Sequence, residues 1–495
     1  MNPERIPVIA GIGEVKDRPS DPILGLEPAA LMAEALRRAD ADAGGGLLAR
    51  IDALDVVNSV SWPYADVLSV VCAKAGIAPR YRNYGPVGGE TPVRFLHEAA
   101  ERIARGESSI AAVCGAEAQH TAAAAARRGI DLPWTEKDPN AVPRNRDYLA
   151  PLVRRHGIDM PIRVYPLYEN ATQAAWGQTP AEGQRESTRL WSLFSSVAAE
   201  NPDSWLTRRF APEEIATASP TNRMIAWPYP KLMTANPLVN QGAAVLVISL
   251  AAARAAGIPD HRLIPIQGGA AAGEPLDYMQ RDQFVHAHAQ DVVLEVALDM
   301  AGGDASRFAH REFYSCFPVV PKMARRKLGL AEDTLPTVAG GLTFHGAPLN
   351  NYMLHAACGM VRALRGDTGA LGLLYGQGGF VTKHRSLVLG GDMSGILTSR
   401  DMQGVADARR GPVPATVDAD AGSATVETHT VVFKTDGTPD FGAVLLRLPN
   451  GDRTMARVPA EDTATLAVLM HPGQSAVGRS GVLSPGRDGL AAWTA

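Results

Sequence analysis

Residues 88–116 read GGETPVRFLHEAAERIARGESSIAAVCGA, and residues 346–376 read GAPLNNYMLHAACGMVRALRGDTGALGLLYG. Each stretch predicts a glycine-containing turn, a helix that ends at an Arg-Gly pair, and a short apolar strand. When the Leu-His pair at Leu96 is aligned with the one at Leu354, the second copy needs only a two-residue insertion. The copies lie roughly 260 residues apart, about one α/β half-domain. We therefore predict two similar halves that build one active site at a pseudo-twofold axis.

Short apolar runs rich in Val, Ile and Ala precede and follow the first copy. Runs within residues 5–13, 52–60 and 243–250 predict buried strands, and residues 26–44 carry the apolar spacing of a helix. Strands that alternate with helices favour parallel sheets covered on both faces. The sequence therefore predicts an α/β protein.

The order of these features resembles the thiolase superfamily. Three further segments are similar to it: Gly115-Ala116-Glu117 at the end of a strand, NQGAA at residues 240–244, and YSCF at residues 314–317. The last stands where thiolases carry Asn-Glu-Ala-Phe and sterol-carrier-protein-type thiolases carry His-Asp-Cys-Phe. The resemblance covers about residues 1–393. It implies a thiolase fold, with two similar α/β halves in five layers (αβαβα).

The family's reactive groups are missing from this chain. The nucleophilic Cys position falls on Gly89, the Gly-His-Pro His position on Ala347, and the second Cys position on Gly376. Without a thiol at residue 89, the acyl-enzyme route is not available there. Gly89 and Ala347 are equivalent positions of the two copies, so the loss of both points to a changed task. The chain most resembles thiolase-like proteins that are labelled acetyl-CoA acetyltransferases by similarity.

Three side chains near the missing groups are candidates for chemistry. His345 stands two residues before the family's His position and could act as a general base near neutral pH, or it could simply bond the backbone. Cys316 aligns with the Cys that, by the resemblance, takes over acid–base work in the sterol-carrier-protein type; the alternative is a buried apolar Cys. Glu90 follows the empty nucleophile position, where it is either a helix cap or a replacement base.

Other residues are candidates for binding. Backbone N–H groups at helix starts hold anions and developing oxyanions, and glycines let a ligand approach them; the alternative is a tight turn against a sheet. Asn350 and Asn351 could orient a carbonyl or a water, although Asn is also common at helix starts. Arg223 and Lys231, in a Pro- and aromatic-rich strip, are candidates for the phosphates of coenzyme A. The predicted oxyanion or substrate-binding set is Gly88, Gly89, Gly346, Asn350, Asn351 and Gly378.

Composition divides the chain into three parts. Residues 1–261 form the first half, with an inserted loop domain at about 121–235 that holds five of the seven tryptophans. Residues 262–393 form the second half, in which residues 274–302 predict a helix. Residues 394–495 begin with a Pro/Gly/Asp linker, and alternating segments then predict a small antiparallel β-domain, barrel-like and of the oligonucleotide/oligosaccharide-binding (OB) type. TATLAVLM, residues 463–470, is one of its predicted strands.

Charge and cysteine usage exclude several classes of protein. A net charge of −4 lacks the excess of positive charge that is typical of nucleic-acid-binding proteins. No apolar stretch reaches the length of a membrane span. The N-terminal MNPERIPVIAGIG lacks a signal-peptide layout, which favours a cytoplasmic protein. Four cysteines without a Cys-x-x-Cys pair argue against a disulfide framework and against a metal site. We expect no covalently bound cofactor, with a coenzyme A ester as substrate or ligand.

Two functions fit these observations. The first is an enzyme of lipid metabolism, of the acyltransferase class, that acts on acyl-CoA thioesters without the usual Cys acyl-enzyme. The alternative is a non-catalytic acyl-CoA- or lipid-binding or scaffold protein on a thiolase fold. The resemblance implies a homodimer through the sheet edge of the first half. The added β-domain could also dock a protein partner.

Overall fold

The computed structural model describes residues 2–141, 146–393, 396–486 and 489–495. Two five-stranded sheets form its centre, and they join where β1 pairs with β8. The first sheet runs β3 (Tyr81–Tyr84), β2 (Ala53–Val56), β4 (Ile110–Ala118), β7 (Asn240–Ser249) and β1 (Pro7–Lys16). The second runs β8 (Ile264–Gly273), β11 (Lys383–Gly390), β10 (Leu371–Gly378) and β9 (Phe308–Phe313), with β12 (Thr398–Asp401) paired to β8.

The duplicated segments occupy equivalent places in the two sheets. β4 ends the first copy and lies between parallel β2 and antiparallel β7. β10 ends the second copy and lies between parallel β9 and antiparallel β11. The helices of the copies are α3 (Thr91–Arg105) and α12 (Tyr352–Gly366), and they contact each other between the sheets. This arrangement confirms the two similar halves.

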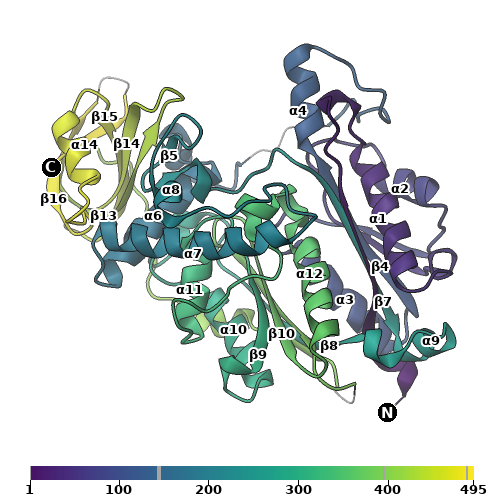
Figure 1. Cartoon of the computed structure of the whole chain (residues 1–495). Coiled ribbons are helices and arrows are strands. Elements are labelled where there is room, and N and C mark those ends of the chain that lie inside the picture. The colour runs from purple at the N-terminus through teal and green to yellow at the C-terminus, as the bar shows by residue number, and fades with distance from the viewer. Residues whose placement is uncertain (1, 142–145, 394–395, 487–488) are drawn as a thin grey trace.

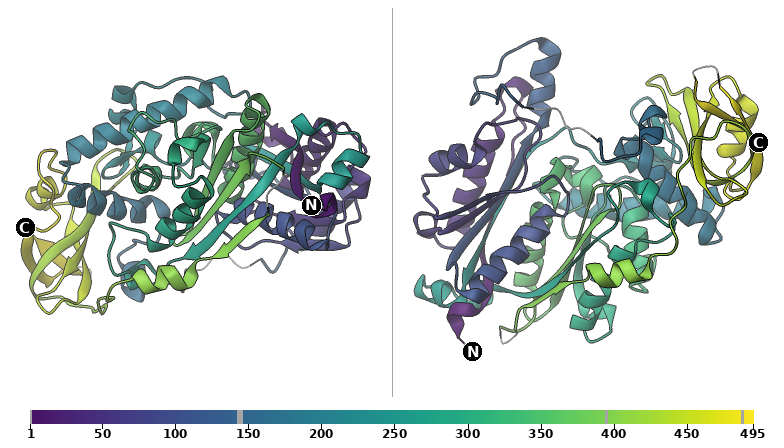
Figure 2. Two further views of the ribbon diagram at one scale, coloured as in Figure 1. Left: turned by 90° about the horizontal axis from the view of Figure 1, so that it is seen from below. Right: turned by 180° about the vertical axis from the view of Figure 1, so that it is seen from behind.

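Helices cover both outer faces of the sheets, which gives five layers (Figures 1 and 2). α1 (Pro28–Asp42) packs on the first sheet, with α2 (Val67–Ala75) against it. α10 (His288–Met300) packs on β8 and β11, and α11 (Val319–Lys327) contacts β9. α12 is buried on all sides from Tyr352 to Val361, as expected for a helix between two apolar sheets. The predicted αβαβα fold is confirmed.

The segment between β4 and β7 contains most of the remaining helices. They are α4 (Gln119–Arg128), α5 (Pro151–Arg155), α6 (Pro161–Ala175), α7 (Pro180–Glu200) and α8 (Pro212–Ala216), followed by β5 (Met224–Ala226) and β6 (Tyr229–Pro230). β5 pairs with β13 (Gly422–Phe433) of the C-terminal region through Val432 and Ala226. The inserted segment and the C-terminal region therefore share one sheet.

The C-terminal region is a closed five-stranded barrel. β13 pairs with β14 (Pro439–Arg447), β14 with β15 (Arg453–Pro459), β15 with β17 (Ala491–Thr494), β17 with β16 (Ser480–Pro485), and β16 with β13 again. Trp493 is fully buried in its core. The predicted barrel-like β-domain is confirmed.

One predicted strand of this barrel is wrong. Residues 463–469 form helix α14, and the last two strands are instead β16 and β17. The Asp462 side chain accepts a hydrogen bond from Thr465 N (3.0 Å) and so caps the helix start. Leu466 and Leu469 point into the barrel core at helical spacing. A short apolar run cannot separate helix from strand by periodicity alone.

The predicted helix at residues 274–302 is correct only from His288 onward. Side chains compete with helical hydrogen bonding before that point. The Asp277 carboxylate accepts from Met279 N (3.0 Å), and Gln283 Oε1 accepts from Val285 N (2.6 Å) and His286 N (2.7 Å). Such local bonds favour turns over helix.

The second sheet extends beyond residue 393, where the sequence places the end of the second half. β12 pairs in parallel with β8 from Thr398 to Asp401, and α13 (Gln403–Arg409) follows it. Residues 394 and 395, at the predicted start of the third part, lie outside the described residues. α9 (Leu250–Ala255) links β7 to β8. All four cysteines are free and buried. No helix in the described ranges is long and apolar enough to cross a membrane.

Candidate functional site

The two copies meet at the start of their helices. Gly88 N donates a hydrogen bond to Asn350 Oδ1 (3.0 Å), and Asn350 Nδ2 donates to the carbonyl of Asn58 (2.9 Å). Gly88 belongs to the first half and Asn350 to the second. Two of the residues predicted for the site therefore lie together at the junction of the halves.

Tyr314 occupies the space in which a side chain at residue 89 would lie. A Cβ atom added to Gly89 would be 2.2 Å from the Tyr314 hydroxyl oxygen and 2.6 Å from the carbonyl oxygen of Gln377. Carbon and oxygen atoms that are not bonded do not approach this closely. A cysteine at position 89 is thus incompatible with this position of Tyr314.

The Glu90 side chain folds back over two glycines. A Cβ atom would lie 2.2 Å from Glu90 Oε2 at Gly88 and 1.9 Å from it at Gly378. Glu90 is the N-cap residue of α3, as the cap alternative predicts, but its side chain makes no capping hydrogen bond. Glu90 is only 5% exposed, and its Oε2 has no hydrogen-bond partner among the described residues. Burial raises the pKa of Glu90, although the Lys383 ammonium 3.9 Å from Oε1 opposes the shift.

A second ionisable side chain, that of Tyr314, therefore lies close to the same turn as Glu90. The Tyr314 hydroxyl makes no hydrogen bond within the described part of the chain. Burial raises the pKa of Tyr314 well above its usual value, and the neighbouring Cys316 and Glu90 add to the shift. Tyr314 is thus held in its protonated form, as a hydrogen-bond donor.

His345 lies in a different buried cluster. Its Nε2 is 4.0 Å from Glu14 Oε1, and its Nδ1 is 3.4 Å from both Asn201 Nδ2 and Ser204 Oγ. Burial lowers the pKa of His345 to about 3, and His355 nearby contributes to the shift. None of its contacts reaches Glu90 or Gly89, so the structure does not bring these candidates together. A catalytic role for His345 stays a prediction.

Glu14, His345 and His355 are the one described group with metal-ligand geometry, since their donor atoms all lie within 4.8 Å of one another. The carboxylate of Glu14 is already bonded by His355 Nδ1 (2.7 Å) and by the Arg362 guanidinium (2.5 Å). Burial opposes ionisation, but these two partners outweigh it and lower the pKa of Glu14 to about 2. A metal cation would have to compete with Arg362 for the only carboxylate, so the donor set fits a metal poorly.

Cys316 lies near the site but is protected. Its Sγ is 3.7 Å from Gln377 Oε1, which also accepts a hydrogen bond from the Tyr165 hydroxyl (2.9 Å). Burial raises the pKa of the Cys316 thiol to about 12. The thiolate is the reactive form, so this environment disfavours nucleophilic or base chemistry.

The remaining predicted residues lie elsewhere. Gly346, with φ of 117°, leaves space for Gln241, whose Oε1 would be 2.5 Å from a Cβ there. Asn351 Nδ2 donates to the carbonyl of Gly115 (2.7 Å). Lys231 N donates to the carbonyl of Arg223 (2.9 Å), which brings these two cationic residues together on the β5–β6 hairpin beside the barrel. Their role in binding coenzyme A stays a prediction.

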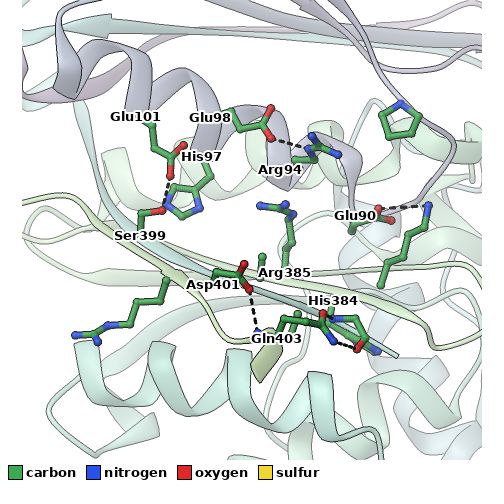
Figure 3. Close-up of a pocket in the computed structure, with 16 residues that line it drawn as sticks. Glu90, Arg94, His97, Glu98, Glu101, His384, Arg385, Ser399, Asp401 and Gln403 are labelled. Atoms are coloured by element: carbon green, nitrogen blue, oxygen red, sulfur yellow. Dashed lines mark hydrogen bonds and ion pairs between the residues drawn. The ribbon is translucent and has the colours of Figure 1, made fainter. Parts of the chain in front are cut away.

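A cleft of about 490 Å³ opens beside Glu90, between α3 and strands β8, β11 and β12 (Figure 3). Glu90 lies at the N-terminal end of α3, and Glu101 lies three turns further along the same helix. Lys383 and Arg385 enter from β11. This cleft gives the buried Glu90 a route toward solvent.

Three buried histidines make stability depend on pH. Burial lowers the pKa of His345 to about 3 and those of His384 and His429 to about 4, whereas it raises the pKa of Glu312 to about 7. As the pH falls from 6.5 to 4.5, unfolding takes up a growing fraction of a proton at each of the three histidines and releases less than one proton from Glu312, so the net uptake is positive and rises. Each net proton changes the unfolding free energy by about 1.4 kcal/mol per pH unit. We expect the melting temperature to fall steadily from pH 6.5 to pH 4.5, as measured by thermal denaturation; an unchanged or rising value would contradict these assignments.

Two residues of the site, Arg385 and Lys383, were not found from the sequence. They belong to a strand, and only the pairing of β11 with β8 and β10 directs them toward α3. The sequence does contain a feature from which the position of Tyr314 could have been predicted. Tyr314 replaces the Asn or His of the family motif with a larger side chain, in a chain that has lost a side chain at Gly89.

Known proteins resemble this chain in its C-terminal region and in its whole fold. Residues 401–485 match the family model described as the thiolase-like protein type 1 additional C-terminal domain. The monomeric SCP2-thiolase-like protein type 1 (STLP1) from Mycobacterium smegmatis is similar over 100% of both chains, with 28% identity and a TM-score of 0.84. No curated protein sequence matches this chain.

Two thiolase structures show the fold alone. The dimeric peroxisomal thiolase of Saccharomyces cerevisiae is 12% identical over 79% of this chain and 98% of its own, with a TM-score of 0.59. The Acat5 thiolase from Ascaris suum, solved in complex with coenzyme A, is 15% identical over 78% of this chain and 100% of its own, with a TM-score of 0.57. Both likenesses end short of this chain's full length, in agreement with the added C-terminal barrel.

Proposed function

We propose that this chain, a thiolase-like protein of the thiolase superfamily, acts on an acyl-CoA thioester without forming a cysteine acyl-enzyme. The observation that carries the proposal is the position of Glu90 and Tyr314. Tyr314 lies against Gly89 and Glu90 Oε2 lies against Gly88 and Gly378, at the junction of the halves. Neither Glu90 Oε2 nor the Tyr314 hydroxyl has a protein hydrogen-bond partner in the described ranges. An acid–base pair without a nucleophile favours proton transfer at the carbon next to the thioester carbonyl.

The two groups have complementary tasks in this reaction. The Glu90 carboxylate takes a proton from the acyl α-carbon, and the electron pair of that C–H bond moves toward the carbonyl oxygen. The Tyr314 hydroxyl donates a hydrogen bond to this developing oxyanion. Burial raises the pKa of Glu90, which makes its carboxylate a stronger base than an exposed one. Return of a proton from Glu90 completes an exchange with solvent.

Coenzyme A is proposed as the carrier because the fold is shared with thiolases, one of which was solved with coenzyme A. Arg223 and Lys231 are the candidates for its phosphates, since their backbones are joined and Lys231 is exposed. The homodimer also stays a proposal, through edge strand β3, where Tyr81 and Tyr84 are exposed. The relative STLP1 is monomeric.

The test is exchange of the acyl α-protons in deuterated water, followed by NMR on acetyl-, propionyl- and butyryl-CoA. We expect the wild-type chain to exchange at least one of them faster than buffer, and Glu90→Gln to lower that rate at least tenfold. Glu107→Gln, at the exposed C-terminal end of α3, is the control and keeps the wild-type rate. Absence of exchange with the wild type, or a normal rate in Glu90→Gln, would contradict the proposal.

A second candidate is non-catalytic binding of an acyl-CoA or another lipid-like ligand. It is favoured by Tyr314, which fills the place of the family's nucleophile. Binding to the folded state raises the melting temperature, whereas catalysis is not needed for that shift. A thermal shift with CoA esters in the absence of α-proton exchange would select this candidate. The barrel as a docking platform for a partner protein is a further proposal of the same kind.

A further inference from the structure

Two arginines that line the cleft beside Glu90, Arg385 and Arg400, have no hydrogen-bonded or ion-paired partner among the described residues, and of the two only Arg385 is partly buried. Arg385, on β11, points across the cavity toward α3 (Figure 3). Its guanidinium makes no hydrogen bond to any described residue and has no carboxylate oxygen within 4.0 Å. The guanidinium carries five N–H donors, so a partly buried one without partners leaves a large unmet hydrogen-bonding demand.

The acidic side chains of the cleft are bonded to other groups. Glu98 accepts from Arg94 Nε (2.6 Å), Glu101 accepts from the Ser399 hydroxyl, and Asp401 accepts from Gln403 N (2.9 Å). Glu90 faces the ammonium of Lys383 at 3.9 Å. After these contacts, Arg385 is the partly buried charged residue of the described lining that has no bonded partner.

The two histidines of the lining add no positive charge near neutral pH. Burial lowers the pKa of His97, and it lowers the pKa of His384 to about 4. His384 Nδ1 accepts a hydrogen bond from the Tyr375 hydroxyl (2.7 Å), which fits a neutral ring. Among the arginines of the lining, Arg94 is bonded to Glu98 and Arg400 is exposed, so Arg385 is the partly buried guanidinium whose N–H donors are free for a ligand.

We propose that Arg385 binds a carboxylate in this cleft and, resting on the proposed function, that the acyl group processed beside Glu90 carries a free carboxylate at the end distal to the thioester. A carboxylate is planar and matches the guanidinium fork with two parallel hydrogen bonds. A phosphate carries more negative charge than a carboxylate, so the nearby carboxylates of Glu90, Glu98 and Glu101 would repel it more strongly. Glu90 and Arg385 line the same cavity, so one ligand can reach both.

The first experiment measures binding to the full-length protein by calorimetry, with glutarate as the probe and inorganic phosphate as its competitor. We expect glutarate to bind, and Arg385→Gln to weaken its Kd at least tenfold. Arg385→Lys, which keeps the charge but loses the fork, is expected to be intermediate. The matched control is Arg311→Gln. Arg311 is a partly buried arginine of β9 in the same sheet. Within the described ranges it donates to the carbonyl of Ala305 (3.2 Å), and it does not line the cleft.

Thermal stability separates a ligand-binding arginine from a structural one. Because Arg385 has no bonded partner in the described ranges, Arg385→Gln is expected to keep or raise the melting temperature while it weakens glutarate binding at least tenfold. The carboxylate site is overturned if glutarate does not bind the wild type, if Arg385→Gln binds it normally, if phosphate is preferred, or if Arg385→Gln lowers the melting temperature.

The second experiment tests the substrate class through α-proton exchange. We expect glutaryl-CoA to exceed butyryl-CoA at least tenfold in kcat/KM with the wild type, and the two rates to become similar in Arg385→Gln. Equal exchange rates for glutaryl-CoA and butyryl-CoA in the wild type would overturn the proposal that the substrate carries a distal carboxylate. If no thioester is exchanged but glutarate still binds through Arg385, the proposed reaction fails and the carboxylate site stands.

Discussion

Lys322→Met is expected to destabilise the protein by about 3–5 kcal/mol, because it leaves a buried carboxylate without its cation. Lys322 on α11 and Glu169 on α6 form an ion pair in which both side chains are fully buried. Glu169 also accepts from the Tyr229 hydroxyl (2.6 Å), and Lys322 donates to the Ser187 hydroxyl (2.9 Å). The pair thus joins the second half to three elements of the inserted segment.

A second lysine on the same helix provides the control. Lys327 pairs with Glu295 at 2.5 Å, but both side chains are about one-third exposed. Lys327→Met is expected to cost less than about 1 kcal/mol, since exposed ion pairs contribute little. Both variants are to be compared by urea unfolding with tryptophan fluorescence, because Lys322 Nζ lies 5.7 Å from the Trp176 ring.

The double variant Lys322→Met/Glu169→Gln tests the cause. It removes both charges, so it should recover part of the loss seen in Lys322→Met alone. An equal loss in Lys322→Met and Lys327→Met would show that burial does not set the strength of this pair. No recovery in the double variant would show that the unpaired carboxylate is not the source of the instability.

The halves and layers could be predicted because they rest on local patterns. The helix and strand of each copy are encoded within about thirty residues, and Gly106 ends α3 in the left-handed conformation that the Arg-Gly pair predicts. The strand predicted for the α14 segment is wrong because seven residues hold less than two full helical periods, and the capping Asp462 decides between helix and strand. The contact of Lys322 with Glu169 joins residues 153 positions apart, and no local pattern encodes it.

The candidate site could be predicted only where the chain fixes the geometry by itself. Gly88 and Asn350 begin duplicated helices, so the symmetry of the copies brings them together. His345 precedes its helix by seven residues, and the positive φ of Gly346 after it directs the turn toward Glu14 instead. The direction of Tyr314 depends on packing against Tyr352 and Gly89, and these neighbours come from separate parts of the sequence.

Gly89→Cys is expected to restore no acyl-enzyme and to destabilise the protein by about 1–3 kcal/mol. The new Cβ would overlap the Tyr314 hydroxyl at 2.2 Å and the Gln377 carbonyl at 2.6 Å, so the turn must shift to admit it. Any shift moves the thiol away from the helix start that would otherwise lower its pKa. Intact-mass spectrometry after incubation with acetyl-CoA, together with urea unfolding, measures both effects.

Gly404→Cys is the matched control, because no atom outside its immediate neighbours lies within 4 Å of a Cβ there. It should leave the unfolding free energy nearly unchanged. Adding Tyr314→Ala to Gly89→Cys removes the nearer obstacle but not the carbonyl of Gln377, so it should recover only part of the lost stability. If Gly89→Cys alone were acylated and fully stable, Tyr314 would not be what closes the family's nucleophile position. Tyr314 is held protonated in that space, so it can donate a proton but is a poor nucleophile, and under the proposed function Gly89 and Tyr314 together replace thiol chemistry with proton donation.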